Sequence, residues 1–128
     1  MNENELSKII VTCAIEVHRT LGGPGLLESV YEEAMAWELA DRGLQVERQQ
    51  AVPIMYKGHA LSTPLKFDIR VNGLVLVECK ATTEYNKIFN VQLLTYLRLL
   101  KLKLGLVVNF GEELVKNGIH RVANGLSD

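Results

Sequence analysis

The sequence predicts an α/β protein built on a mixed β-sheet flanked by helices. Three observations indicate this class. Apolar residues near the N-terminus recur with helical spacing, the middle of the chain changes to short β-rich runs, and a later helical pattern separates these runs from one more buried strand. A strand, a helix and a further strand in succession imply a right-handed crossover that lays the two strands parallel. We expect the order α-α-β-β-β-α-β.

Two helices are expected first. The spacing i, i+3, i+4, i+7 predicts an amphipathic helix that ends at Gly22-Gly23-Pro24. Its apolar positions are Leu6, Ile9, Ile10, Cys13, Ala14, Val17 and Leu21. A second helix begins beyond Pro24 and ends near Gly43, its expected C-terminal cap. Its predicted common face consists of Leu27, Val30, Tyr31, Ala34 and Trp37.

From Leu44 onward the pattern predicts an antiparallel meander. Its expected strands lie around Val46 and over 51–56, 67–71 and 74–79, with Lys57-Gly58 and Asn72-Gly73 as separating turns. A third helix is expected over about 85–100. The run 103–109 is apolar enough for a strand buried on both faces, and a last short strand is expected around 119–122.

Length and composition indicate one soluble domain over residues 1–128. Hydrophobic residues make up 48% and charged residues 23%, which excludes the disordered class. Fourteen Lys and Arg against fifteen Asp and Glu give a net charge of −1, so any contact with a polyanion must be local. The expected sources are Lys57, Lys66, Arg70, Lys80 and Lys87, with His120-Arg121 near the end, although any one of them is more often a solvated surface charge.

Cysteine usage and the absence of targeting features predict a cytoplasmic protein. Cys13 and Cys79 fall at apolar positions and lack the spacing of a metal site or redox motif, so we expect reduced core residues. The N-terminus does not resemble a signal peptide. No apolar run approaches the ~18 residues of a membrane span.

Asp68, Glu78 and Lys80 are the candidate site. Glu78 and Lys80 are two apart on a strand and therefore share a face. A two-residue Asn72-Gly73 loop would put Asp68 on the opposite face, so the loop must have odd length or carry a bulge.

A three-residue loop, Val71-Asn72-Gly73, would pair Asp68 with Leu76 and gather the carboxylates and the lysine on one face. It would place Phe67, Ile69, Val75 and Val77 together on the other, apolar face. Two carboxylates and an amine in one spot are what a Mg²⁺ site needs to cut a phosphate ester.

Three further residues are candidates for the same site. Gln92 and Tyr96 are i, i+4 neighbours on the third helix and could contact a phosphate, although such residues are more often packing and solvent contacts. Glu28, one turn before Tyr31, could supply a further metal ligand or support one. Favourable placement of a carboxylate in the first turn of a helix explains Glu28 equally well.

With these residues assembled, the chain resembles the bacterial GxxExxY protein family, a branch of the PD-(D/E)xK nuclease superfamily with the restriction-endonuclease-like fold. The resemblance covers nearly the whole chain. It rests on Gly25-x-x-Glu28-x-x-Tyr31, on Phe67-Asp68 with Glu78-Cys79-Lys80, on Gln92-x-x-x-Tyr96, and on the closing Asn109-Phe110-Gly111 and His120-Arg121. One departure is Phe67, which stands where the superfamily's name has proline.

The resemblance implies roles for the candidate residues. Asp68 and Glu78 would bind Mg²⁺, with Mn²⁺ as a substitute, Lys80 would position or activate the attacking water, and Gln92 with Tyr96 would border the phosphate. The expected function is a nuclease that acts on DNA.

Two alternatives remain open. One is a catalytically inactive module of the same fold that binds nucleic acid or a protein partner. The other is a homodimer with paired sites, in which the first two helices would form the interface.

Overall fold

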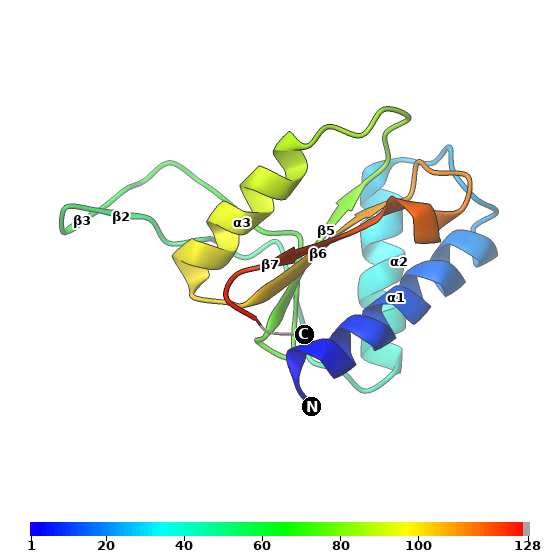
Figure 1. Ribbon diagram of the computed structural model, residues 1–128, viewed down its shortest axis with the longest axis horizontal. Helices are drawn as coiled ribbons and strands as arrows, with labels where there is room; N and C mark the ends of the chain where they lie inside the picture. The colour runs from blue at the N-terminus through cyan, green and yellow to red at the C-terminus, as the bar shows by residue number, and fades with distance from the viewer. Residues whose placement is uncertain (127–128) are drawn as a thin grey trace.

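The computed structural model describes residues 1–126 and has three layers. A five-stranded sheet, in the order β1-β4-β5-β6-β7, has α1 and α2 on one face and α3 on the other (Figure 1). The helices are α1 (Glu3–Thr20), α2 (Glu28–Asp41) and α3 (Ile88–Leu100), with a 3-10 turn, η1 (Val115–Gly118). The strands are β1 (Val46–Arg48), β2 (Met55–Tyr56), β3 (His59–Ala60), β4 (Ile69–Val71), β5 (Val75–Lys80), β6 (Leu104–Asn109) and β7 (Ile119–Ala123). The predicted fold class is confirmed.

The first helix forms as predicted, whereas α2 buries a different face. A capping box, in which the Asn2 side chain accepts from Glu5 N and the Glu5 side chain accepts from Asn2 N, begins α1. The buried residues of α2 are Tyr31, Glu32, Met35, Ala36 and Leu39. Trp37 is 66% exposed and Leu27 73%, so the predicted common face is wrong. Apolar residues lie around most of this helix, and spacing alone does not select the face that packs.

The crossover places the two central strands as predicted. β5 and β6 are parallel, with Val75 opposite Leu104 and Lys80 opposite Asn109, and α3 connects them across one face. Every residue of β6 is buried, as expected for a strand covered on both faces. β7 closes the sheet antiparallel to β6.

The β4–β5 hairpin has the expected odd loop but a different register. Asn72 (φ 51°) and Gly73 (φ 66°) form the turn, which Leu74 N closes by donating to the Val71 carbonyl at 3.0 Å. Leu74 is the additional residue, so Val71 pairs with Val75 and Ile69 with Val77. The predicted pairs are two residues out of register. Because side chains alternate with a period of two, this shift leaves each strand residue on its predicted face.

Phe67 is an exception to that alternation. The strand begins only at Ile69, and the chain bends at Asp68. Phe67 consequently packs with Leu76 on the α3 side, while Ile69, Val75 and Val77 pack under α1 and α2. The prediction that these four apolar residues share one face is therefore wrong at Phe67.

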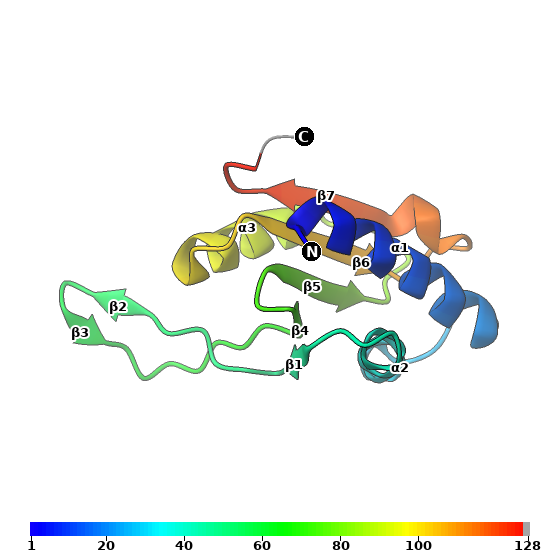
Figure 2. The same cartoon turned by 90° about the horizontal axis from the view of Figure 1, so that it is seen from below.

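The run 51–56 does not join the main sheet, contrary to the predicted meander. Only Met55–Tyr56 is a strand, and it pairs with His59–Ala60 across the Lys57-Gly58 turn. This second, two-stranded sheet lies at the end of an arm that projects from the body of the protein (Figure 2).

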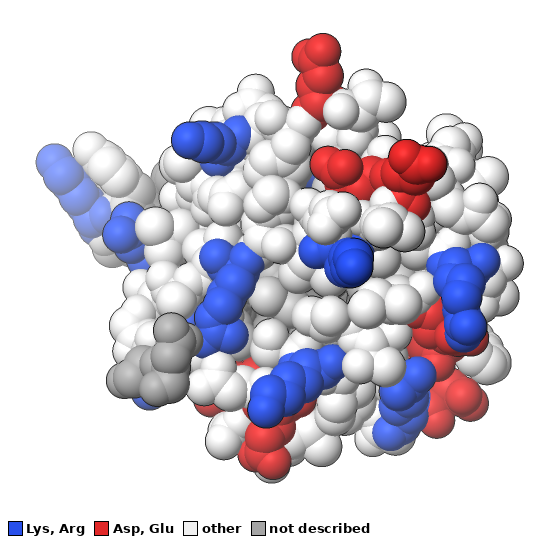
Figure 3. All heavy atoms as spheres, turned by 45° about the vertical axis from the view of Figure 1, so that its right-hand side comes forward, with Lys and Arg blue, Asp and Glu red and all other residues white. Residues whose placement is uncertain are grey.

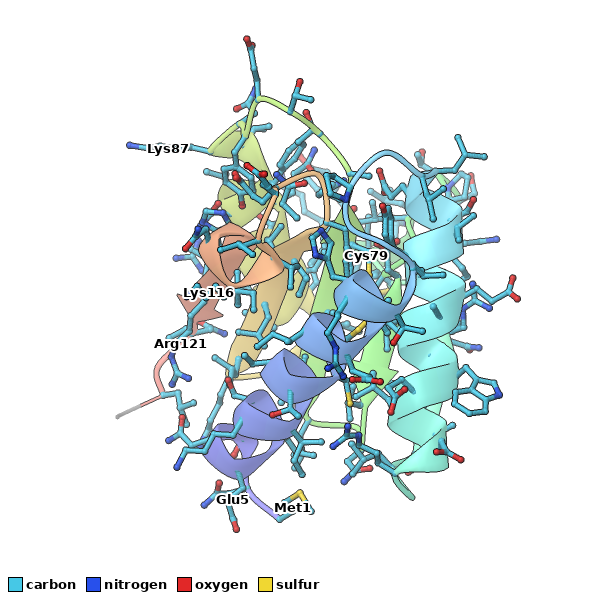
Figure 4. All side chains as sticks on the ribbon, turned by 90° about the vertical axis from the view of Figure 1, so that its right-hand side faces the viewer. Met1, Glu5, Cys79, Lys87, Lys116 and Arg121 are labelled. Carbon is cyan, nitrogen blue, oxygen red and sulfur yellow. The ribbon has the colours of Figure 1, made fainter. Side chains whose placement is uncertain are left out.

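Both cysteines are free and buried, as predicted. Cys13 and Cys79 belong to the core between the sheet and α1 and α2. In the view of Figure 4, Cys79 lies behind these two helices, whereas Lys87 and Lys116 point outward. None of the helices within residues 1–126 combines the length and apolar character needed to cross a bilayer.

A junction of backbone and side chain fixes the chain immediately after β5. Asn109, fully buried, accepts from Thr82 N and Gly111 N and donates to the Thr82 carbonyl, each at 3.0 Å. Phe110 N donates to the Lys80 carbonyl at 2.7 Å. A Cβ at Gly111 would lie 2.2 Å from the Thr82 carbonyl oxygen, so only glycine fits. The junction therefore determines where the end of β5, and with it Lys80, lies.

Gly111→Ala should lower the free energy of unfolding by about 3 kcal/mol, because the methyl group meets backbone that cannot move without breaking the Asn109 bonds. Urea denaturation measures this loss. The matched control is Gly22→Ala, where φ is +92° but a Cβ meets no atom within 4 Å, so only about 1 kcal/mol of strain is expected. Equal losses for the two variants would contradict the importance of the junction.

Candidate active site

Asp68 and Glu78 are joined at the carboxyl end of β5. The Asp68 Oδ2 atom accepts from Cys79 N at 2.9 Å, and Asp68 N donates to Glu78 Oε1 at 3.3 Å. The bond to Cys79 connects the Asp68 carboxylate to the backbone of the residue that follows Glu78. The predicted convergence of these two carboxylates is therefore present.

Glu78 is an acidic side chain in a largely water-excluded position. It is 8% exposed, and burial, together with the charge of Asp68, raises its pKa to about 9. The Lys80 ammonium acts in the opposite direction and lowers that pKa. A carboxyl group in this position stays protonated at neutral pH unless a positive charge replaces the proton.

Lys80 lies beside the carboxylates and against α3. Its Nζ atom is 4.6 Å from the centre of the Phe89 ring, within the range of a cation–π contact. Its charge also lowers the pKa of Glu28, an exposed residue at the start of α2, although partial desolvation is the larger effect and raises that pKa. Lys80 thus lies within electrostatic range of a glutamate of α2 and a glutamate of β5.

Tyr96 shares this environment, and Gln92 does not make a comparable contact. Burial raises the pKa of the Tyr96 hydroxyl, and the charges of Glu78 and Asp68 raise it further. Gln92 is exposed one turn earlier on α3, and within residues 1–126 no hydrogen bond joins it to the carboxylates. The expected group of six residues is therefore only partly assembled in the structure.

Glu32 and Gln49 belong to the site, although neither was predicted from the sequence. Gln49 Nε2 donates to Glu32 Oε1 at 2.8 Å and to Asp68 Oδ1 at 3.2 Å. Glu32, 6% exposed, also accepts a hydrogen bond from Arg48 at 3.0 Å. Burial raises the pKa of Glu32, and the charge of Asp68 raises it further. The i, i+4 spacing of Glu28 and Glu32 was the available signal for one of them.

Gln49 contacts the carboxylates of Glu32 and Asp68 from an unusual backbone conformation. Its φ is 51°, in the left-handed region that non-glycine residues rarely occupy, and its N–H donates to the Asp68 carbonyl at 2.9 Å. Such strain persists where surrounding contacts determine the conformation. No pattern of residue types in the sequence predicts this conformation of Gln49.

Tyr31 positions the loop that leads into Glu28. Its ring stacks on Phe110 at 4.7 Å between centroids with 4° between planes. Its hydroxyl donates to the Gly23 carbonyl at 2.7 Å and accepts from Leu26 N at 3.2 Å. The tyrosine of the Gly25-x-x-Glu28-x-x-Tyr31 motif therefore holds the start of α2 through the loop rather than facing the carboxylates.

The expected basic residues do not form one surface. Arg70 makes a two-pronged ion pair with Glu47, at 2.9 and 2.7 Å, so it is not free for a phosphate. Lys57 and Lys66 lie on the arm, away from Lys87 near the start of α3. The face shown in Figure 3 carries acidic and basic side chains interspersed, without a continuous positive area.

A scan against family models matches residues 4–122 to a model described as the PD-(D/E)XK nuclease superfamily. The chain belongs to this superfamily. Searches of the curated proteins and of the solved structures found no match. Members of the superfamily are mostly nucleases, so the family indicates a nuclease, and the mixed sheet with flanking helices is consistent with its restriction-endonuclease-like fold.

The donors at the site suit the divalent metals that PD-(D/E)XK nucleases generally use. Asp68 and Glu78 present carboxylate oxygens, the ligands that hard cations prefer. Within residues 1–126, no three His, Cys, Asp or Glu side chains are grouped as a complete metal site. Magnesium often takes only one or two carboxylates and completes its shell with water and phosphate, so two carboxylates fit Mg²⁺ better than Zn²⁺.

The pKa of Glu78 predicts how stability depends on pH. In the folded chain its pKa is about 9, against an ordinary value of 4.5, so the folded state binds the proton more tightly. The stabilisation that this bound proton gives the folded state is fully present below pH 4.5 and is lost as the pH rises towards 9. In metal-free buffer, Glu78→Gln should therefore raise the melting temperature at pH 8 by about 4 °C and flatten its decline from pH 5 to 9.

Differential scanning fluorimetry across that pH range measures the effect. Glu113→Gln, at an exposed glutamate, is the control and should follow the unmodified protein. If Glu78→Gln and Glu113→Gln gave parallel curves, the shifted pKa of Glu78 would be refuted.

Tyr31→Phe should lower the free energy of unfolding by about 1–2 kcal/mol. The ring still stacks on Phe110, but Leu26 N and the Gly23 carbonyl lose their partner. Urea midpoints measure the loss, with Tyr56→Phe as the control because Tyr56 is 58% exposed. An unchanged midpoint for Tyr31→Phe would show that the loop does not depend on the hydroxyl.

Proposed function

We propose that this protein is a Mg²⁺-dependent phosphodiesterase that cuts DNA. The observation that carries the proposal is the pair of carboxylates Asp68 and Glu78, linked through the backbone of β5 and adjacent to Lys80. Membership of a superfamily that consists mostly of nucleases supports the same reaction class.

The carboxylates would hold the cation. Asp68 and Glu78 would supply its protein oxygens, and Glu28 would act as a further ligand or as support for one. A bound Mg²⁺, or Mn²⁺ in its place, supplies positive charge that stabilises the transition state of phosphate-ester hydrolysis. The raised pKa of Glu78 supports this assignment, because a cation favours the ionised form that burial disfavours.

Lys80 would orient the attacking water and donate to a phosphate oxygen on which negative charge develops. Phe89 holds its ammonium by a cation–π contact, which limits its freedom. Tyr96 would border the phosphate from α3, with Gln92 beside it. In the proposed hydrolysis, water adds to phosphorus, the phosphate–sugar ester bond breaks, and the leaving sugar oxygen takes a proton.

Three finer assignments belong to the proposal. The substrate is DNA rather than RNA, and the chain is a member of the GxxExxY branch, whose motif includes Glu28 and Tyr31. The two buried, unpaired cysteines support a reducing compartment, the cytoplasm.

A second candidate is a non-catalytic module that docks a protein, and one feature favours it. An apolar groove of about 530 Å³ lies between α1 and α2. It is lined by Val17, Leu21, Val30, Ala34 and Trp37 and bordered by Glu16, Glu33 and Glu38. The separate alternative, a homodimer with paired sites, would use the same groove, because a second copy of the chain would cover the exposed Trp37. Sedimentation velocity on the protein and on Trp37→Ala tests this alternative.

Cleavage of single-stranded, duplex and branched DNA in Mg²⁺ and in Mn²⁺ tests the proposed reaction. Asp68→Asn, whose amide oxygen can still accept from Cys79 N, should reduce the rate by about 100-fold or more. Mn²⁺ should raise the melting temperature of the unmodified protein but not that of the variant.

Asp41→Asn, at an exposed aspartate at the end of α2, is the matched control and should retain full activity. Equal and negligible cleavage by the unmodified protein and Asp68→Asn, together with no stabilisation by metal, would refute the proposed reaction.

A further inference from the structure

The arm formed by residues 50–66 extends directly from the candidate active site. Gln49, which bonds to Asp68, lies at its base, and Phe67 N donates to the Gln50 carbonyl at 3.2 Å. The ladder continues outward, with Val52 N donating to the Leu65 carbonyl at 2.7 Å and Leu61 N to the Ile54 carbonyl at 2.9 Å. The β1–β4 pair and the arm are thus one continuous ribbon that passes the site.

The arm lies outside the core along most of its length. Val52 at the base is buried, but Met55 is 62% exposed, Tyr56 58% and Leu61 47%. Figures 1 and 2 show the β2–β3 end standing clear of the sheet and of every helix. A two-stranded ribbon with exposed apolar residues contributes little stability by itself. Its length and composition therefore require another explanation.

Positive charge on the arm is unopposed within the ribbon. Between Glu47 and Asp68 the chain contains no acidic residue, whereas Lys57 lies at the tip and Lys66 near the base. The projecting segment at the far left of Figure 3 shows basic atoms and no acidic atoms. The rest of that face carries charges of both signs.

Lys57 occupies a turn position that disfavours lysine. Its φ is 49° and that of Gly58 is 81°, as in the two-residue hairpin turns that favour Asn-Gly. A non-glycine residue in this region costs of order 1 kcal/mol. Its Nζ atom lies 5.5 Å from the centre of the Tyr56 ring, so the tip presents an ammonium beside an exposed aromatic face. A strained, charged residue at the end of a ribbon is more consistent with binding than with folding.

From these observations we infer that the arm binds duplex DNA beside the phosphate group that the candidate site would hold. The inference rests on the proposed function for the position of that phosphate. Two-stranded β-ribbons fit the major groove of B-form DNA, whereas the major groove of A-form RNA is too narrow. The eight residue-to-residue steps from Gln49 to Lys57 span at most about 26 Å at about 3.3 Å each, which is less than one turn of the double helix.

The test is binding of a fluorescent 30-base-pair DNA duplex in metal-free buffer over a range of salt concentrations. The Lys57→Ala/Lys66→Ala variant should bind about tenfold more weakly at 0.1 M salt and reduce the slope of log K against log salt by about 2. The matched control is Lys8→Ala/Lys116→Ala, which removes two exposed lysines from elsewhere on the chain and should bind normally. An RNA duplex of the same sequence should bind more weakly than the DNA.

A single substitution separates binding from folding. Lys57→Asn suits the left-handed turn and should leave the melting temperature unchanged or raise it, yet it should weaken DNA binding. Lys57→Arg should retain binding. Equal DNA affinity of Lys57→Asn, the double arm variant and the unmodified protein would overturn the inference, as would an unmodified protein that binds RNA duplex as well as DNA.

The two proposals fail differently. Binding that depends on the arm, without cleavage in any metal, would refute the phosphodiesterase and support the inference. Cleavage, combined with DNA binding that does not depend on the arm, would support the phosphodiesterase and refute the inference about the arm.

Discussion

The hydrogen bond from the Cys79 amide to the Asp68 carboxylate is the interaction on which the site depends. It joins a residue at the bend before β4 to the backbone of β5, between Glu78 and Lys80. The return bond from Asp68 N to Glu78 holds the second carboxylate in the same place. The two acidic groups are thus oriented by backbone amides of the sheet, whose positions the neighbouring strands determine. A site built in this way keeps its geometry without relying on flexible side chains.

The residues behind the site are as important as those in it. The Asn109 junction fixes the end of β5, and Tyr31 stacks on Phe110 from the other side while holding the loop before Glu28. Asn109, Phe110 and Tyr31 therefore support the carboxylates from behind the site.

Burial opposes ionisation at Glu78. Burial beside Asp68 makes its ionised form costly, and an uncharged side chain would suit the fold better. The same environment favours a bound cation, because positive charge relieves the repulsion between the two carboxylates. Gln49 and Glu32 extend this network into α2 and the base of the arm, so the arm and the acidic site share one set of hydrogen bonds.

The sequence by itself determined the fold class, the first and third helices, the parallel β5–β6 pair and the convergence of Asp68 with Glu78. The fold class, the helices and the strand pair follow from periodicity, whereas the convergence also required a hairpin loop of odd length. A two-residue register error does not change which face a strand residue occupies. Only the tertiary structure decided the buried face of α2, the side on which Phe67 packs, the ion pair of Arg70 with Glu47, the strained link at Gln49 and the separation of the arm from the sheet. Each of these depends on contacts between residues far apart in the chain, which local spacing does not encode.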